Sequence, residues 1–127
     1  MKVLIVEDEE ILSKVLQEKF IKENFEVKLA EDGAVVLSLV KSFKPNIIVL
    51  DLMLPKKSGF EVLQELKADP EVKNIPVIVL SNLGQDEEIK KALNLGAVDY
   101  FVKAQHPINE VVEKVSNRLI NPKGGVK

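Results

Sequence analysis

The residues best suited to chemistry in this sequence each follow a short apolar run. The acidic pair Glu7 and Asp8 follows KVLIV, and Asp51 follows NIIVL. Two later runs, PVIVL and VDYFV, lead to Ser81 and Lys103. Burying an unpaired charge is expensive, so we expect the charged groups at the exits of strands, facing partners or water.

Such a set of side chains can hold a hard cation and bind a phosphoryl group. Clustered carboxylates repel one another, so one stays protonated or the group recruits a cation. All-oxygen ligands suit Mg²⁺, which commonly binds one or two carboxylates together with phosphate and water. A lysine and a hydroxyl can neutralise phosphoryl oxygens, and a carboxylate can act as a nucleophile that forms an aspartyl phosphate. We therefore interpret Asp51 as a candidate nucleophile.

The apolar runs predict five strands, at residues 2–6, 25–30, 46–50, 76–80 and 98–102. Most are apolar throughout, which is typical of strands in a parallel sheet that is covered on both faces. The run FEVKLA at 25–30 alternates between apolar and polar residues and therefore favours an edge position.

Helical patterns separate the strands, at residues 9–23, 33–42, from Ser58 to before Pro70, 85–95 and 108–119. Ser58 and Glu61 have the spacing of a capping box, and Gly96 suits the position after a helix. Alternation of strand and helix five times over predicts a doubly wound α/β fold with a parallel sheet. Ligands of such sheets bind beyond the carboxyl ends of the strands, where the polar residues above converge.

The amino-acid composition excludes several classes of protein and of binding site. The net charge is −2, from 18 basic and 20 acidic residues, so bulk electrostatics favours neither nucleic acid nor a membrane as partner. The absence of cysteine and the single histidine, His106, exclude a disulfide framework, a thiolate zinc site and a multi-histidine metal site. The apolar runs are too short for a membrane span, and acid follows too early for a secretory signal. We expect one cytoplasmic domain, residues 1–120, with a flexible tail at 121–127.

Residues 2–120 resemble a receiver domain of the two-component response regulators, with the fold of the bacterial chemotaxis receiver. The resemblance depends on five segments in order, namely ED at 7–8, DLMLPKKSG from Asp51, LS ending at Ser81, GAVDYFVK with Tyr100, and Lys103 itself. It implies the strand order 2-1-3-4-5 with helices on both faces. It also implies that a sensor histidine kinase or a histidine phosphotransfer protein, or a small acyl phosphate, phosphorylates Asp51.

The resemblance also implies a Mg²⁺ site. Asp8, Asp51 and the backbone carbonyl of Met53 would hold the ion, and Glu7 would act largely through a metal-bound water. Ser81 and Lys103 would each contact a phosphoryl oxygen.

A signalling role follows from the same resemblance. The domain would be a switch that catalyses only its own phosphorylation and dephosphorylation, rather than an enzyme. Ser81 and Tyr100 would be the switch residues, and the surface for an output partner would lie within residues 85–120. The resemblance names neither the kinase nor the output partner.

Two positions depart from the family. Asn82 stands where a small Ala or Gly is usual, and we expect it to alter access to the phosphoryl group. Ala104 replaces the proline that commonly follows the lysine, and we expect a trans bond between Lys103 and Ala104, because a cis bond without proline costs about 2.5–4 kcal/mol.

Three other functions compete. A haloacid-dehalogenase-like phosphatase requires a second aspartate two residues after its nucleophile, where this chain has Met53. A flavodoxin-like FMN carrier needs a hydroxyl- and glycine-rich loop after the first strand, where this chain has the acidic EDEEIL. A receiver-shaped interaction module that signals without phosphorylation stays open as the alternative.

Overall fold

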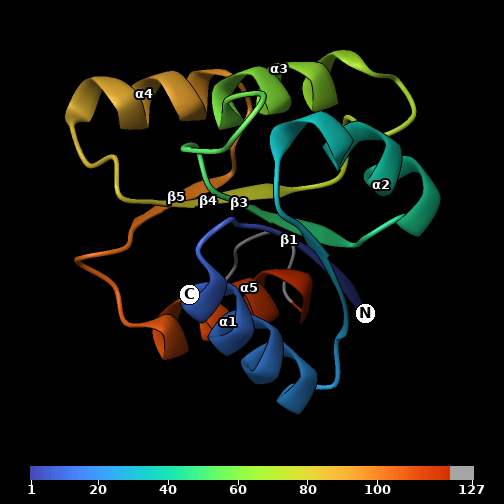
Figure 1. Ribbon diagram of the computed structural model, residues 1–127, viewed down its shortest axis with the longest axis vertical. Coiled ribbons are helices and arrows are strands. Elements are labelled where there is room, and N and C mark those ends of the chain that lie inside the picture. Colours follow the sequence, from blue (N-terminus) through green and yellow to red (C-terminus); the bar gives the residue numbers. More distant parts are fainter. Residues whose placement is uncertain (121–127) are drawn as a thin grey trace.

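A five-stranded parallel sheet forms the centre of the computed structural model, which describes residues 1–120 (Figure 1). The strands are β1 (Lys2–Val6), β2 (Glu26–Ala30), β3 (Ile47–Leu50), β4 (Val77–Ser81) and β5 (Asp99–Val102). Their order is β2-β1-β3-β4-β5, and all neighbouring pairs are parallel. The predicted fold class and strand order are confirmed, and the alternating strand β2 lies at an edge as expected.

Helices cover both faces of the sheet. They are α1 (Glu10–Lys22), α2 (Val36–Phe43), α3 (Gly59–Ala68), α4 (Asp86–Asn94) and α5 (Ile108–Ile120), with a 3₁₀ turn at Gly33–Val35 before α2. Figure 1 shows α1 and α5 on one face and α2, α3 and α4 on the other. Each face has its own apolar core, one containing Leu16, Phe20 and Val111, the other containing Val40 and Leu63.

Local signals in the sequence set the ends of α3 and α4. The amide of Glu61 donates to Ser58 Oγ at 3.2 Å, and the amide of Ser58 donates to Glu61 Oε1 at 3.3 Å, so the predicted capping box is present. Gly96 follows α4 with a φ of +115°, a conformation that only glycine adopts without strain.

The predicted division into a domain at 1–120 and a tail at 121–127 stays a prediction. Residues 1–120 form the fold described above, whereas the predicted tail at 121–127 lies outside the described residues. Over the described part of the chain, no helix combines the length and the apolar character that crossing a bilayer requires.

Candidate functional site

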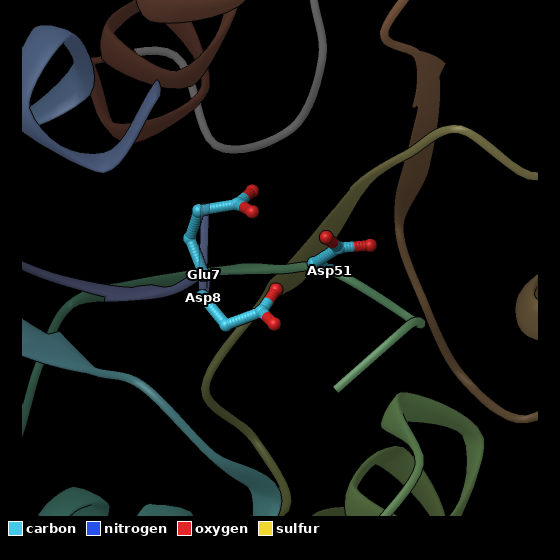
Figure 2. A group of neighbouring side chains, drawn as sticks. All are labelled: Glu7, Asp8 and Asp51. Atoms are coloured by element: carbon cyan, nitrogen blue, oxygen red, sulfur yellow. The ribbon is translucent and has the colours of Figure 1, made fainter. Parts of the chain in front are cut away.

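The carboxyl ends of the neighbouring strands β1 and β3 bring three carboxylates together. Val6 ends β1 and its carbonyl accepts a hydrogen bond of 3.0 Å from the amide of Asp51, so the two strand ends stay in register. Glu7, Asp8 and Asp51 each offer an oxygen within 4.8 Å of the other two (Figure 2). Glu7 and Asp51 are buried, with 2% and 3% of their surface exposed, whereas Asp8 is exposed.

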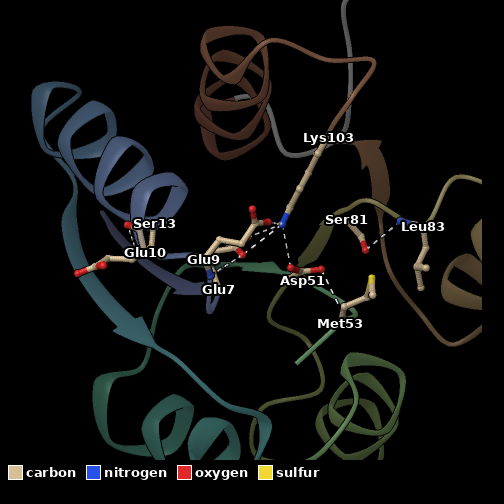
Figure 3. Close-up of polar contacts among 9 residues, drawn as sticks. All are labelled: Glu7, Glu9, Glu10, Ser13, Asp51, Met53, Ser81, Leu83 and Lys103. Carbon is tan, nitrogen blue, oxygen red and sulfur yellow. Dashed lines mark hydrogen bonds and ion pairs between the residues drawn. The ribbon is translucent and has the colours of Figure 1, made fainter. Parts of the chain in front are cut away.

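Lys103 connects the strand β5 to this cluster. Its amide donates to the carbonyl of Ser81 at 2.9 Å, which extends the pairing of β4 and β5 by one residue. The side chain is only 9% exposed, and its Nζ lies 2.9 Å from Asp51 Oδ2 and 3.0 Å from Glu7 Oε1. It also pairs with Glu9 (Figure 3). The lysine therefore neutralises part of the charge of a buried acidic site.

The loop between β3 and α3 holds the side chain of Asp51 and the backbone next to it. The amide of Met53 donates to Asp51 Oδ1 at 3.1 Å, and the amide of Gly59 donates to the carbonyl of Leu52 at 2.9 Å. A Cβ on Gly59 would lie 2.4 Å from the carbonyl oxygen of Asp51, so no other residue fits there without a shift of the backbone. The first turn of α3 thus lies directly against the candidate nucleophile.

The electrostatics of the site favour an added cation. Burial, reinforced by the charge of Asp51, raises the pKa of Glu7 from 4.5 to about 7. Burial works against the charged form of Lys103, but its hydrogen bonds to Glu9 and Asp51 raise the pKa of Lys103 overall. One ammonium among several carboxylates leaves an excess of negative charge, and the cluster offers only oxygen donors, so its chemistry fits Mg²⁺.

Ser81 and Tyr100 lie beside the acidic cluster and share one backbone partner. Ser81 is fully buried, and its Oγ accepts a hydrogen bond of 3.3 Å from the amide of Leu83. The hydroxyl of Tyr100 donates to the carbonyl of the same Leu83. Burial, with a contribution from the charge of Glu88, raises the pKa of Tyr100. Both hydroxyl groups are therefore bonded to the β4–α4 loop, and the hydrogen-bond partners of the Asp51 carboxylate in the described chain are Lys103 and the amide of Met53.

The convergence predicted at the strand ends is what the structure shows, while the individual roles of these residues stay predictions. The bond between Lys103 and Ala104 is trans, as expected, since residues 1–120 contain no cis peptide bond. Asn82 is exposed. Sequence reasoning missed Glu9 as a partner of Lys103 and Leu83 as the link between the two hydroxyl groups. The run EDEE at 7–10 was the available signal for Glu9.

Comparison with known protein families identifies the family of this chain. The family described as "Response regulator receiver domain" matches residues 3–116. The chain belongs to this family. The receiver domain is 35% identical over 123 residues to a "Probable transcriptional regulator ycf27" of Cyanophora paradoxa, covering 95% of this chain and 50% of that protein. It thus spans about half the length of this relative.

Solved structures of receiver domains have the same fold as this chain. The crystal structure of the phosphorylated cyanobacterial phytochrome response regulator RcpA is 29% identical with a TM-score of 0.83, and the match covers 95% of this chain and 94% of that one. A Mn²⁺-bound response regulator is 28% identical with a TM-score of 0.79, over 99% of this chain and 96% of that one. The receiver domain is thus a signalling module of two-component systems rather than a classical enzyme.

Proposed function

We propose that this receiver domain is a phosphorylation-dependent switch that accepts a phosphoryl group on Asp51. The donor would be the phosphohistidine of a sensor histidine kinase or of a histidine phosphotransfer protein. The single observation that carries the proposal is the buried carboxylate of Asp51, held 2.9 Å from the ammonium of Lys103 and grouped with Glu7 and Asp8. The phosphorylated state of the similar regulator RcpA supports the same chemistry here.

In this reaction the phosphoryl group passes from an imidazole nitrogen of the donor to a carboxylate oxygen of Asp51. A carboxylate oxygen of Asp51 attacks the phosphorus, an O–P bond forms, and the N–P bond to the donor's imidazole breaks. The donor nitrogen keeps the electron pair of the broken bond. Lys103 is already within hydrogen-bond distance of Asp51 and donates to one phosphoryl oxygen, and the Ser81 hydroxyl, which accepts from the amide of Leu83, turns to donate a hydrogen bond to another.

A divalent cation would complete the charge balance. Asp8 and Asp51 would ligate Mg²⁺ directly together with the backbone carbonyl of Met53, and Glu7 would act through a bound water. When bound, the ion supplies positive charge that stabilises the transferred phosphoryl group. The close carboxylates, the raised pKa of Glu7 and the Mn²⁺-bound state of a similar regulator support this assignment.

Output would pass through the β4–α4 loop. A phosphoryl group adds about −1.5 to −2 charges beside Ser81 and Lys103. If Ser81 turns toward that group, the Leu83 amide loses its partner, and the carbonyl that Tyr100 holds belongs to the same residue. The change would bias a pre-existing equilibrium of the surface formed by α4, β5 and α5, where an output partner would bind.

The proposal can be tested by incubating the protein with acetyl phosphate and measuring whether its mass rises by that of one phosphoryl group. The wild type should gain one phosphate with Mg²⁺ present and none in excess EDTA, and Asp51→Asn should gain none. Asp86→Asn, an equivalent change at an exposed position of α4, is the matched control and should behave as the wild type. Modification of Asp51→Asn at the wild-type rate would contradict the assignment. An unmodified wild type would favour the interaction module that signals without phosphorylation.

A further inference from the structure

Lys103 has a third carboxylate partner that lies outside the cluster with metal-binding geometry. Its ammonium contacts Asp51, Glu7 and Glu9, which occupies its three N–H donors. The cluster of close carboxylates within residues 1–120 contains Glu7 and Asp51 but not Glu9. In that part of the chain the only ion pair of Glu9 is with Lys103. The acidic side chain therefore acts on the lysine alone.

The backbone of Glu9 is held in place while its carboxylate stays available. Glu9 stands at the N-cap of α1, where short polar side chains usually bond to the first turn, but its side chain makes no such bond. Its amide donates to Glu7 Oε2 at 3.1 Å, and its carbonyl accepts from the amide of Ser13 at 2.9 Å. The long side chain instead extends across to Lys103 (Figure 3).

The three partners of Lys103 differ in exposure, which decides which of them can leave. Glu7 and Asp51 are almost fully buried, whereas the side chain of Glu9 is 53% exposed. When Asp51 is phosphorylated, the phosphoryl group takes over the N–H of Lys103 that Asp51 held, and any further N–H that it requires must be released by Glu7 or Glu9. A released Glu9 is solvated by water, whereas a released Glu7 would remain as a buried charge without a partner.

We propose that Glu9 is a competing acceptor for Lys103, which holds the ammonium in the unphosphorylated state and is displaced by a phosphoryl oxygen. This inference rests on the proposed function and adds a regulatory residue to it. Glu9 is a positioning residue, since it acts through Lys103 and sets how available the ammonium is. Replacing its carboxylate by a neutral amide should make a phosphoryl mimic bind more tightly, because the amide competes for the ammonium less strongly than the carboxylate does.

The dissociation constant of beryllofluoride at saturating Mg²⁺, measured by NMR titration, tests this competition. The matched control is Glu10→Gln, which removes the same charge one residue away. Within residues 1–120, Glu10 forms an ion pair only with Lys14, its side chain is 82% exposed, and Figure 3 shows it directed away from Lys103. We expect Glu9→Gln to bind the mimic about three- to fivefold more tightly than the wild type, and Glu10→Gln to stay within about twofold.

A second comparison separates competition from simple charge repulsion. In a Lys103→Gln background, Glu9→Gln should no longer tighten binding beyond the effect of Glu10→Gln, because the competition needs the ammonium. The Mg²⁺ dissociation constant, measured without the mimic, should change by about twofold or less in both single variants. Equal tightening with and without Lys103 would overturn the inference. A wild type that binds beryllofluoride with no change in Glu9→Gln would overturn it while leaving the proposed function intact, and a wild type that binds none would overturn both.

Discussion

The two halves of the site differ in how they are held before any phosphoryl group arrives. The half at β1 and β3 is ionic, with Lys103 bonded to Asp51, Glu7 and Glu9. The half at β4 is neutral, and there Ser81 and Tyr100 are bonded to the backbone of Leu83 and not to Asp51. In Figure 3 the ionic contacts lie on one side of Asp51 and the Ser81–Leu83 contact on the other.

This difference assigns separate tasks to the two halves. The ionic half is complete in the resting state, so it can bind a cation and receive the phosphoryl group without a large rearrangement. In the neutral half, the Ser81 hydroxyl accepts from the loop at rest and would donate to the phosphoryl group once it turns toward that group. Two arrangements of similar free energy are what a switch between two states needs. Variants in the ionic half should therefore change binding and stability, and variants in the neutral half should change little until the site is filled.

The largest effect is expected from Lys103→Ala, which removes the only cation that contacts Asp51 in the described chain. Truncating one partner of a buried charge pair costs about 2–5 kcal/mol, so beryllofluoride should bind about 30-fold or more weakly. Lys57→Ala is the control, because Lys57 pairs with Glu65 outside the site. NMR titration with Mg²⁺ present measures both variants. Wild-type affinity in Lys103→Ala would show that the ionic half does not bind the mimic.

Two glycines allow a matched comparison of the backbone on either side of Asp51. A Cβ on Gly59 would lie 2.4 Å from the carbonyl oxygen of Asp51, whereas a Cβ on Gly84 would meet Val102 Cγ1 at 3.2 Å. Backbone cannot move aside as a side chain can, so we expect Gly59→Ala to destabilise by about 2–4 kcal/mol and Gly84→Ala by about 1 kcal/mol or less. Urea unfolding gives both values. Equal losses would mean that the two loops are equally constrained.

The fold and most of the site could be predicted because each depends on signals local to the chain. Continuous apolar runs separated by helical periodicity indicate a parallel sheet, and the ends of its strands must share one edge. That rule was sufficient for Glu7, Asp51 and Lys103. It could not find Glu9, since a long side chain on a loop reaches a partner only through the geometry of the fold.

Backbone partners are hidden from sequence reasoning for a different reason. Leu83 joins Ser81 and Tyr100 through its amide and its carbonyl, groups that every residue except proline carries. Its apolar side chain gives no sign of this role. The resting direction of the Ser81 hydroxyl therefore had to come from the structure.

The free energy of unfolding should depend on pH because of Glu7 in the ionic half. Burial and the charge of Asp51 raise the pKa of Glu7 from 4.5 to about 7, so the folded state holds the proton more tightly than the unfolded state. The resulting stabilisation is complete below pH 4.5 and is lost as the pH rises to about 7. Glu7→Gln cannot ionise, so without metal it should be more stable than the wild type above this range, by about 2 kcal/mol after allowance for screening.

Urea unfolding in EDTA between pH 5 and pH 8 would measure this difference, about one pH step at a time. The exposed acid Glu18 on α1 offers a control, since Glu18→Gln should follow the wild-type curve. A Glu7→Gln curve parallel to the wild type across the whole range would mean that Glu7 does not carry the pH dependence.

The smallest effect is expected in the neutral half, from Tyr100→Phe. The change removes the hydrogen bond to the carbonyl of Leu83 and leaves that half-buried group to water, so unfolding should become easier by about 1 kcal/mol. The Mg²⁺ dissociation constant should stay within about twofold of the wild type, because the lost bond touches none of the cluster's carboxylates. Urea unfolding and a metal titration on the same sample give both quantities. A Tyr100→Phe variant with strongly altered Mg²⁺ affinity would show that the two halves are already coupled before phosphorylation, and the division between a preformed ionic half and a responsive neutral half would then be wrong.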